Sequence, residues 1–120
     1  MTQDLAAFAA ENNVKYFMIS FTDLFGGQRA KLVPAQAIAD MQKNGAGFAG
    51  FATWLDMTPA HPDMLAVPDP ASVIQLPWKP EVAWVAGNCV MEGADVAQAP
   101  RNVLRRLVAE AAAADMHVKT

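Results

Sequence analysis

The sequence predicts a small α+β domain in which a helix packs on one face of a mixed sheet. Residues 14–33 show the alternation of a β-hairpin, a short helix follows them, and three further apolar runs come after a long loop. The length of 120 residues suits one domain with a modest hydrophobic core.

The first predicted elements are a helix and the hairpin. Residues 3–11 carry apolar side chains at helical spacing. Residues 14–21 alternate and are rich in aromatic and β-branched side chains, which is typical of a strand. Gly26 and Gly27 can take the positive φ of a tight reversal, and residues 28–33 then alternate polar and apolar positions as the second strand.

A short helix, a long loop and three strands are predicted next. Pro34 can begin the helix, because its missing N–H would have no partner in a first turn. Gly45 can cap the end of that helix, and the loop then extends to residue 64. The predicted strands are 64–69, 72–78 and 82–91. The last of them is apolar on both faces, so we expect it at the centre of the sheet.

The C-terminal part is predicted to be a linker followed by an amphipathic helix. Residues 92–100 have the composition of a linker, and Pro100 opens a helix of about four turns. The apolar face of this helix consists of Val103, Leu104, Leu107, Val108 and Ala111. Residues 116–120 are typical of a strand that is just beginning, so we expect the chain to be the first part of a longer protein.

The composition is apolar for so short a chain. Hydrophobic residues make up 53% of it and charged residues 18%, which predicts a surface that another domain or another copy of the chain covers. The net charge of −3 argues against nucleic acid as a partner, because phosphates require a basic face. The N-terminus lacks the features of a signal peptide and no apolar stretch could span a bilayer, so we expect a cytoplasmic protein with no membrane partner.

Most residues whose side chains could react or bind a ligand have a structural interpretation. Cys89 lies in an apolar run, so a buried, inert thiol is expected, and a single cysteine excludes a disulfide within the chain. His61 and Asp63 are too few ligands for a metal, and a polar turn between prolines is the better interpretation. Asp23 and Asp69 are predicted to be turn aspartates.

Two basic side chains and one acidic side chain leave alternatives open. Arg29 and Lys31 point the same way from one predicted strand, where they can bind an acidic partner or form a solvated sheet face, which is the simpler interpretation. Asp56 lies in a loop with Trp54, Phe51 and other apolar side chains. A carboxylate in such surroundings can be held against a cation, either a Lys or Arg side chain or a bound ammonium. No catalytic set can be assembled from these residues.

Four segments resemble, in order, the N-terminal region of glutamine synthetases. The stretch VKYFMISFTDLFGGQRAKLVPAQAI resembles the opening hairpin of that family, where a strand ending in F-T-D leads through a glycine turn to a strand ending in V-P. FAGFATW stands where the family has F-D-G-S-S, PDMLAVPDPASVIQLPW resembles its D-x-x-L-x-P-D stretch, and APRNVLRRLVAEA resembles its P-R-x-x-L-x-R helix. The loop GFAGFATWLDM is most similar to the type III and γ-glutamylmethylamide synthetase-like branch.

The resemblance implies that residues 1–99 form a β-grasp-like N-terminal domain and that residues 100–120 begin the catalytic domain. The whole protein would be an ATP-dependent carbon–nitrogen ligase that forms γ-glutamyl phosphate from glutamate and ATP and then displaces phosphate with ammonia or an amine. Residues outside this chain would hold ATP and Mg²⁺ (or Mn²⁺), so the 120-residue chain alone is expected to bind neither and to be inactive. The family also implies a homo-oligomer, a dodecamer by resemblance.

The loop after the short helix is where the chain departs from the family pattern. In the family, the F-D-G-S-S loop reaches the active site of a neighbouring subunit, and its aspartate helps to hold and deprotonate ammonium. Here Ala49 stands in place of that aspartate, and Phe51 and Ala52 replace the serines. Either Asp56 supplies the charge, or the nucleophile differs. A methylated amine would suit a more apolar pocket, with Phe51 and Trp54 on one face of it. The alternative to a ligase is a free-standing β-grasp module for binding or assembly.

Overall fold

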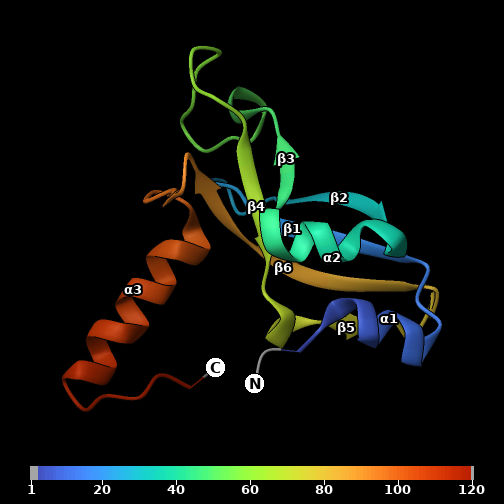
Figure 1. The fold of residues 1–120 in the computed structure, drawn as a ribbon. Helices are drawn as coiled ribbons and strands as arrows, with labels where there is room; N and C mark the ends of the chain where they lie inside the picture. Colours follow the sequence, from blue (N-terminus) through green and yellow to red (C-terminus); the bar gives the residue numbers. More distant parts are fainter. Residues whose placement is uncertain (1–2, 120) are drawn as a thin grey trace.

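A mixed seven-stranded sheet forms the centre of the protein in the computed structural model, which describes residues 3–119 (Figure 1). The strands are β1 Tyr16–Thr22, β2 Gln28–Pro34, β3 Ala46–Phe48, β4 Met64–Pro68, β5 Ile74–Gln75, β6 Val82–Met91 and β7 Ala94–Asp95. The helices are α1 Leu5–Asn12, α2 Ile38–Asn44 and α3 Pro100–Ala113, and short 3₁₀ turns occupy Ala35–Ala37, Gly50–Ala52 and Pro70–Ser72.

The strand pairing makes the sheet a mixed one. The strand order runs β2-β1-β6-β4-β3, and the short strands β5 and β7 also pair with β6. Strands β1 and β2 form the predicted antiparallel hairpin, in which Thr22 lies opposite Gln28. Strand β1 is parallel to β6, whereas β4 is antiparallel to β6. The predicted mixed sheet with a helix packed on it is therefore confirmed.

Local chemistry explains where the first two helices begin and end. The Asp4 carboxylate caps α1 by accepting from the amide of Ala6 at 2.9 Å, and Asn13 closes the helix in the left-handed conformation. Gly45 closes α2 with a φ of +85°, as predicted. Pro34 does not begin that helix, because it is still paired in β2 and a 3₁₀ turn intervenes before Ile38.

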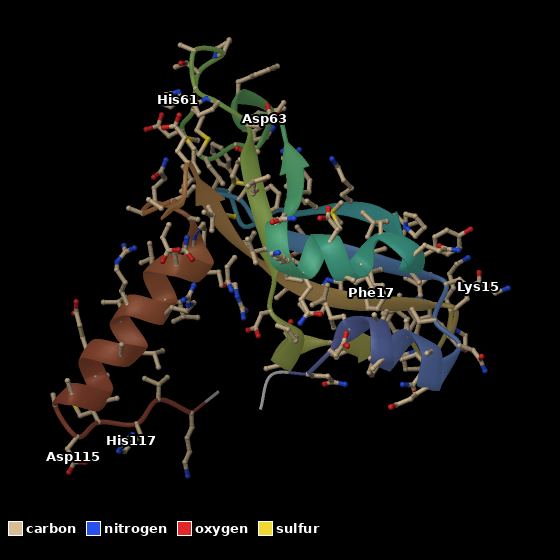
Figure 2. All side chains as sticks on the ribbon, viewed as in Figure 1. Lys15, Phe17, His61, Asp63, Asp115 and His117 are labelled. Atoms are coloured by element: carbon tan, nitrogen blue, oxygen red, sulfur yellow. The ribbon has the colours of Figure 1, made fainter. Side chains whose placement is uncertain are left out.

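The hydrophobic core lies between the sheet and helices α1 and α2. Phe17 and Ile19 of β1 are fully buried there, and Figure 2 shows Phe17 between the two helices in this view. The Gln42 side chain joins the two helices, because its Oε1 accepts from the amide of Leu5 at 2.9 Å. Strand β6 is buried over most of its length, which confirms the predicted central strand. Cys89 in β6 is buried as predicted, and this burial raises the pKa of its thiol to about 12.

Two predictions for the C-terminal part are wrong. The predicted linker 92–100 contributes a short strand to the sheet, since Glu92 and Gly93 reverse the chain with positive φ and β7, Ala94–Asp95, then pairs with β6. Val96 is also buried, at 5% exposure. Residues 116–119 form no strand, and Thr120 lies outside the described residues. The strand predicted at 72–78 is present only as the two residues of β5.

Helix α3 begins at Pro100 as predicted and projects away from the sheet (Figure 1). Its first turn is anchored, because the side chain of Asn102 is buried and bonds to the carbonyls of Cys89 and Val96. The predicted apolar face is largely uncovered in the described chain, with Leu104 and Leu107 more than half exposed. Among residues 3–119, no helix is both long enough and apolar enough to cross a membrane.

Candidate functional site

Two loops that are distant in sequence meet at one end of the sheet. They are the β1–β2 turn, residues 23–27, and the segment 49–57 that follows β3. The amide of Leu24 donates to the carbonyl of Trp54 at 3.2 Å. The rings of Phe25 and Trp54 pack edge to face, with centroids 5.4 Å apart and an interplanar angle of 81°. The two loops therefore form one continuous surface.

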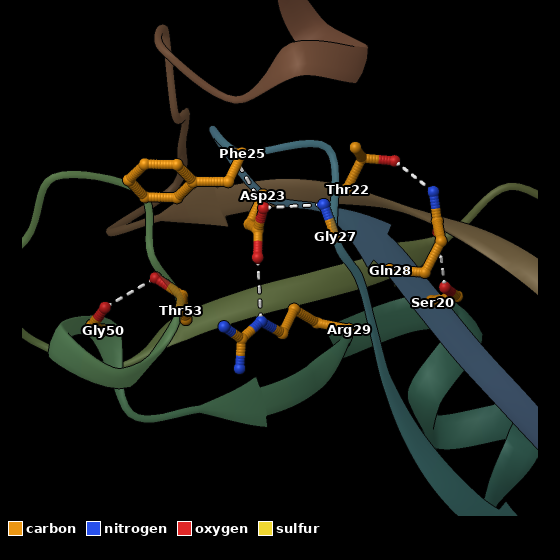
Figure 3. Close-up of polar contacts among 9 residues, drawn as sticks. All are labelled: Ser20, Thr22, Asp23, Phe25, Gly27, Gln28, Arg29, Gly50 and Thr53. Carbon is orange, nitrogen blue, oxygen red and sulfur yellow. Dashed lines mark hydrogen bonds and ion pairs between the residues drawn. The ribbon is translucent and has the colours of Figure 1, made fainter.

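A buried carboxylate shapes the β1–β2 turn. Asp23 is 3% exposed, and its Oδ1 accepts from the amides of Phe25 and Gly27, both at 2.9 Å. Its Oδ2 accepts from Arg29 Nε at 3.0 Å (Figure 3). The Arg29 guanidinium lowers the pKa of Asp23 below its ordinary value, and the two amide donors act in the same direction. Asp23 is the predicted turn aspartate, with an ion pair in addition.

Glycine is required at position 27, next to the Asp23 carboxylate. A Cβ on Gly27 would lie 2.8 Å from Asp23 Oδ2, closer than nonbonded atoms approach. The absence of a side chain at Gly27 thus leaves room for the carboxylate between two backbone amides and a guanidinium. Gly26 supplies the reversal itself, with a φ of +82°.

The second loop alternates between buried and exposed side chains. Thr53 and Leu55 are buried, and Thr53 Oγ1 donates to the carbonyl of Gly50 at 2.6 Å (Figure 3). The carbonyl of Leu55 accepts from Gln98 Nε2 at 2.8 Å, which ties the loop to the segment before α3. Because Leu55 points into the core, Trp54 and Asp56 on either side of it are exposed, and both have left-handed φ, of 56° and 59°.

The predicted site residues Phe51, Trp54 and Asp56 lie around one open depression of about 420 Å³. Its remaining lining residues are Leu24, Phe25 and Met57. Four of these side chains are large, apolar and strongly exposed, and we call them the aromatic surface: Leu24 at 46%, Phe25 at 79%, Phe51 at 58% and Trp54 at 55%.

Asp56 is an exposed acid at the edge of the aromatic surface. In the described residues 3–119, the acids that form ion pairs are Asp23, Glu81, Asp69 and Asp115. Asp56 is not among them, so the alternative in which a Lys or Arg side chain of this part of the chain holds Asp56 is not realised. The carboxylate faces a depression whose other walls are apolar.

In β2, Arg29 is partly exposed and Lys31 is exposed, and each also makes a contact outside its strand. Arg29 contacts the second loop, and Lys31 contacts β3. The Arg29 guanidinium lies 5.5 Å from the centroid of the Trp54 ring. Lys31 Nζ donates to the carbonyl of Gly47 and lies 5.0 Å from the centroid of the Phe48 ring. The interpretation as a purely solvated sheet face is therefore incomplete, because Arg29 contacts a ring of the aromatic surface and Lys31 contacts the strand before that loop.

The remaining candidate metal ligands do not lie close together. His61 Nδ1 accepts from the amide of Thr58 at 2.9 Å, which confirms the polar turn. His61 and Asp63 stand on a loop at the opposite end of the molecule from His117 (Figure 2). Within residues 3–119, no group of three or more His, Cys, Asp or Glu side chains could hold a metal ion.

Asp69 has a larger role than the predicted turn aspartate. It accepts from the amide of Ala71 at 3.1 Å, as expected of a turn. It also pairs with Arg101 at 2.5 Å, and Arg101 Nε donates to Asn88 Oδ1 at 2.9 Å. This network fixes the first turn of α3 to β6 and lies outside the depression.

Sequence reasoning missed two residues that line the depression, Leu24 and Phe25, and it considered Arg29 only for an acidic partner and not for a contact with Trp54. A signal for the first two was present, since a tight turn is ordinarily polar and this one carries two large apolar side chains. Arg29 gave no such signal, because its contact with Trp54 depends on how the loops fold together.

The known proteins that are similar to this chain include glutamine synthetases and a glutamate–methylamine ligase. The chain is 75% identical over all 120 residues to a glutamine synthetase of Rhizobium leguminosarum bv. phaseoli and 72% identical to one of Rhizobium meliloti, and it spans 28% of the length of each. It is 42% identical over 81 residues, 66% of the chain, to a glutamate–methylamine ligase of Methyloversatilis universalis, of which the match covers 18%. No protein-family profile matches the chain.

Two solved structures that are described as GmaS are also similar to this chain. The structure described as "GmaS/ADP complex-Conformation 1" has 61% sequence identity and a TM-score of 0.92, and the match covers 96% of this chain and 26% of that one. "Apo GmaS without ligand" has the same identity and TM-score, with 95% and 27% covered. The fold described above is therefore shared in detail with a part of these larger proteins.

Proposed function

The chain belongs to the glutamine synthetase family, and on that basis we propose that the protein containing it is an ATP-dependent carbon–nitrogen ligase that joins glutamate to ammonia or a small amine. Residues 1–99 are its β-grasp N-terminal domain, and residues 100–120 begin the catalytic domain. The reaction forms γ-glutamyl phosphate from glutamate and ATP, and the amine then displaces phosphate. The active enzyme is a homo-oligomer.

The single observation that carries the role of this chain is the convergence of Phe51, Trp54 and Asp56 on one depression. We assign this depression to the amine side of a neighbouring subunit's active site. A protonated amine is attracted by a carboxylate and by the face of an indole ring, and both are present here. The aromatic surface is exposed in the described chain, as expected of a subunit contact.

The other substrates belong elsewhere in the protein. ATP requires a divalent metal held by clustered carboxylates, which residues 3–119 do not offer. We therefore place ATP, Mg²⁺ or Mn²⁺ and glutamate on the part of the protein outside this chain. For the acceptor, the apolar walls of the depression favour an amine that carries a methyl group, because such a group gains from contact with Phe51 and Trp54 whereas ammonium has no apolar surface.

An amine panel on the full-length protein tests the proposal. Phosphate release is followed with glutamate, ATP and either ammonia or methylamine, and we expect release that depends on an amine, with methylamine preferred. A clear preference for ammonia would remove the methylamine assignment. No amine-dependent release with any member of the panel would refute the ligase.

Asp56→Asn tests the assignment of the charge. The substitution conserves shape and leaves the apolar neighbours intact, so assembly should be unchanged. Loss of one charge-assisted contact is worth about 1.5–3 kcal/mol, which lowers kcat/KM for the amine by about ten- to a hundredfold and leaves the KM values of ATP and glutamate unchanged. Asp63→Asn is the matched control, because Asp63 is also an exposed acid but lies outside the depression. Equal kinetics for the two variants would show that Asp56 only orders its loop.

A further inference from the structure

We propose that Arg29 is a positioning residue that fixes the Trp54 ring as a wall of the depression, an inference that rests on the proposed amine-binding role of that depression. Arg29 is not among the residues that line the depression, and it acts through Trp54, over whose ring its guanidinium lies at 5.5 Å. The contact joins the second strand of the hairpin to the loop after β3.

The Trp54 backbone needs support from outside its own loop. Its φ of +56° lies in the left-handed region, which a large side chain rarely adopts without constraint. Its side chain is 55% exposed, so the core does not hold it. The described contacts that restrain it are the hydrogen bond from the Leu24 amide, the edge-to-face contact with the Phe25 ring and the Arg29 guanidinium.

Arg29 can provide that support because its own position is fixed. Its Nε donates to Asp23, and Asp23 is held in turn by the amides of Phe25 and Gly27 (Figure 3). An arginine can donate its Nε–H to a carboxylate while its flat guanidinium lies against an aromatic ring, whereas a lysine ammonium has no flat face with which to do both. The geometry thus links a buried turn to an exposed ring through one side chain.

The ion pair also suits the electrostatics of the proposed site. An unpaired guanidinium beside Trp54 would repel a protonated amine that approaches the depression. The Asp23 carboxylate cancels that charge at 3.0 Å, so Asp56 remains the acid that determines the charge of the depression. Arg29 can therefore stiffen the wall without opposing the ligand.

A double-mutant cycle on the full-length enzyme tests the proposal. Arg29→Gln should raise the KM for the amine about three- to thirtyfold, while the KM values for ATP and glutamate stay within twofold of wild type. Trp54→Ala should have a similar or larger effect. In the Trp54→Ala background, Arg29→Gln should raise the KM for the amine by less than a further twofold, because the ring through which Arg29 acts is absent. Fully additive effects would overturn the proposal.

Lys31→Gln is the matched control. Lys31 lies two positions along the same strand and also contacts an aromatic ring, but that ring belongs to Phe48, which does not line the depression. We expect an amine KM within twofold of wild type for this variant. If Lys31→Gln raises the amine KM as much as Arg29→Gln does, the effect is a general loosening of the loop and the proposal is wrong.

Hydrogen exchange supplies a readout that does not depend on activity. In the full-length protein, Arg29→Gln should speed amide exchange about tenfold in peptides that contain Leu24, whose amide bonds to Trp54, and Lys31→Gln should not. Unchanged exchange together with a raised amine KM would overturn the positioning role, because Arg29 would then act on the amine directly. If the wild-type protein uses no amine, the proposed function fails, and the exchange measurement still decides whether Arg29 holds Trp54.

Discussion

The buried amide of Asn102 offers the sharpest test of how helix α3 is attached. Asn102 is 2% exposed, and its Nδ2 donates to the carbonyls of Cys89 and Val96, both at 2.9 Å. Its Oδ1 accepts from an Arg105 nitrogen at 3.2 Å. One side chain therefore holds the first turn of α3 against β6 and the segment after β7, while most of the remaining helix is exposed.

The expected loss of free energy in an Asn102 variant follows from the two buried hydrogen bonds. A neutral hydrogen bond contributes about 0.5–1.5 kcal/mol net, so Asn102→Ala should cost about 1–3 kcal/mol, or about five- to 150-fold in the opening equilibrium of α3. Asn102→Asp should cost more, because an ionised carboxylate of the same shape cannot donate and faces two carbonyl oxygens. Arg105→Ala is the control, since Arg105 is exposed and loses only the 3.2 Å contact.

Amide hydrogen exchange on the 120-residue chain measures this opening. Amides of residues 103–106 should exchange faster by that factor in Asn102→Ala, whereas the amide of Val85 in the centre of β6 should change little. If the amides of α3 exchange at the wild-type rate in Asn102→Ala, the helix is not anchored through this side chain. If those of α3 and β6 accelerate equally, Asn102 stabilises the whole domain rather than the attachment.

Two further predictions concern buried titratable groups. Burial raises the pKa of Cys89 to about 12, so iodoacetamide should leave the folded chain unmodified at pH 8 and should alkylate it in denaturant; rapid alkylation of the folded chain would contradict this. The Arg29 ion pair and two amide donors lower the pKa of Asp23, so its stabilising contribution is complete above the unfolded-state value of about 3.9 and is lost as the pH falls through the folded-state value. The stability difference between wild type and Asp23→Asn, measured by urea unfolding, should therefore be largest near pH 6 and shrink in acid; a difference that does not depend on pH would show that the charge of Asp23 is unimportant.

The parts of the fold that the sequence predicted have strong local signals. The hairpin alternates along both strands with glycines at its turn, and the central strand β6 is apolar on both faces over ten residues. Residues 92–99 gave no such signal, because β7 is only two residues long and exists through its pairing with β6. Val96 is buried by the arrangement of elements that are distant in sequence, which composition does not encode.

The residues around the candidate site also divide into those that the sequence predicted and those that it did not. Phe51, Trp54 and Asp56 share one loop, so their proximity could be expected from the sequence and from the resemblance to a family. Leu24 and Arg29 come from the hairpin and reach Trp54 only because Asp23 folds the turn back over its own amides. Contacts between two irregular segments have no periodicity, and no pattern along the chain could have revealed them.

The two exposed apolar surfaces differ in their side chains and in the contacts that support them. The uncovered face of α3 is aliphatic and has helical spacing, and within the described chain no network of charges supports it beyond the first turn. Such a face is stabilised by continuous packing, which fits our proposal that a catalytic domain follows this chain and covers it. In the aromatic surface, the Trp54 ring instead contacts Arg29, which is paired with Asp23, and the carboxylate of Asp56 lies at the edge. Fixing side chains before a partner arrives lowers the entropy cost of binding, which fits our proposal that a small ligand binds here at a subunit boundary.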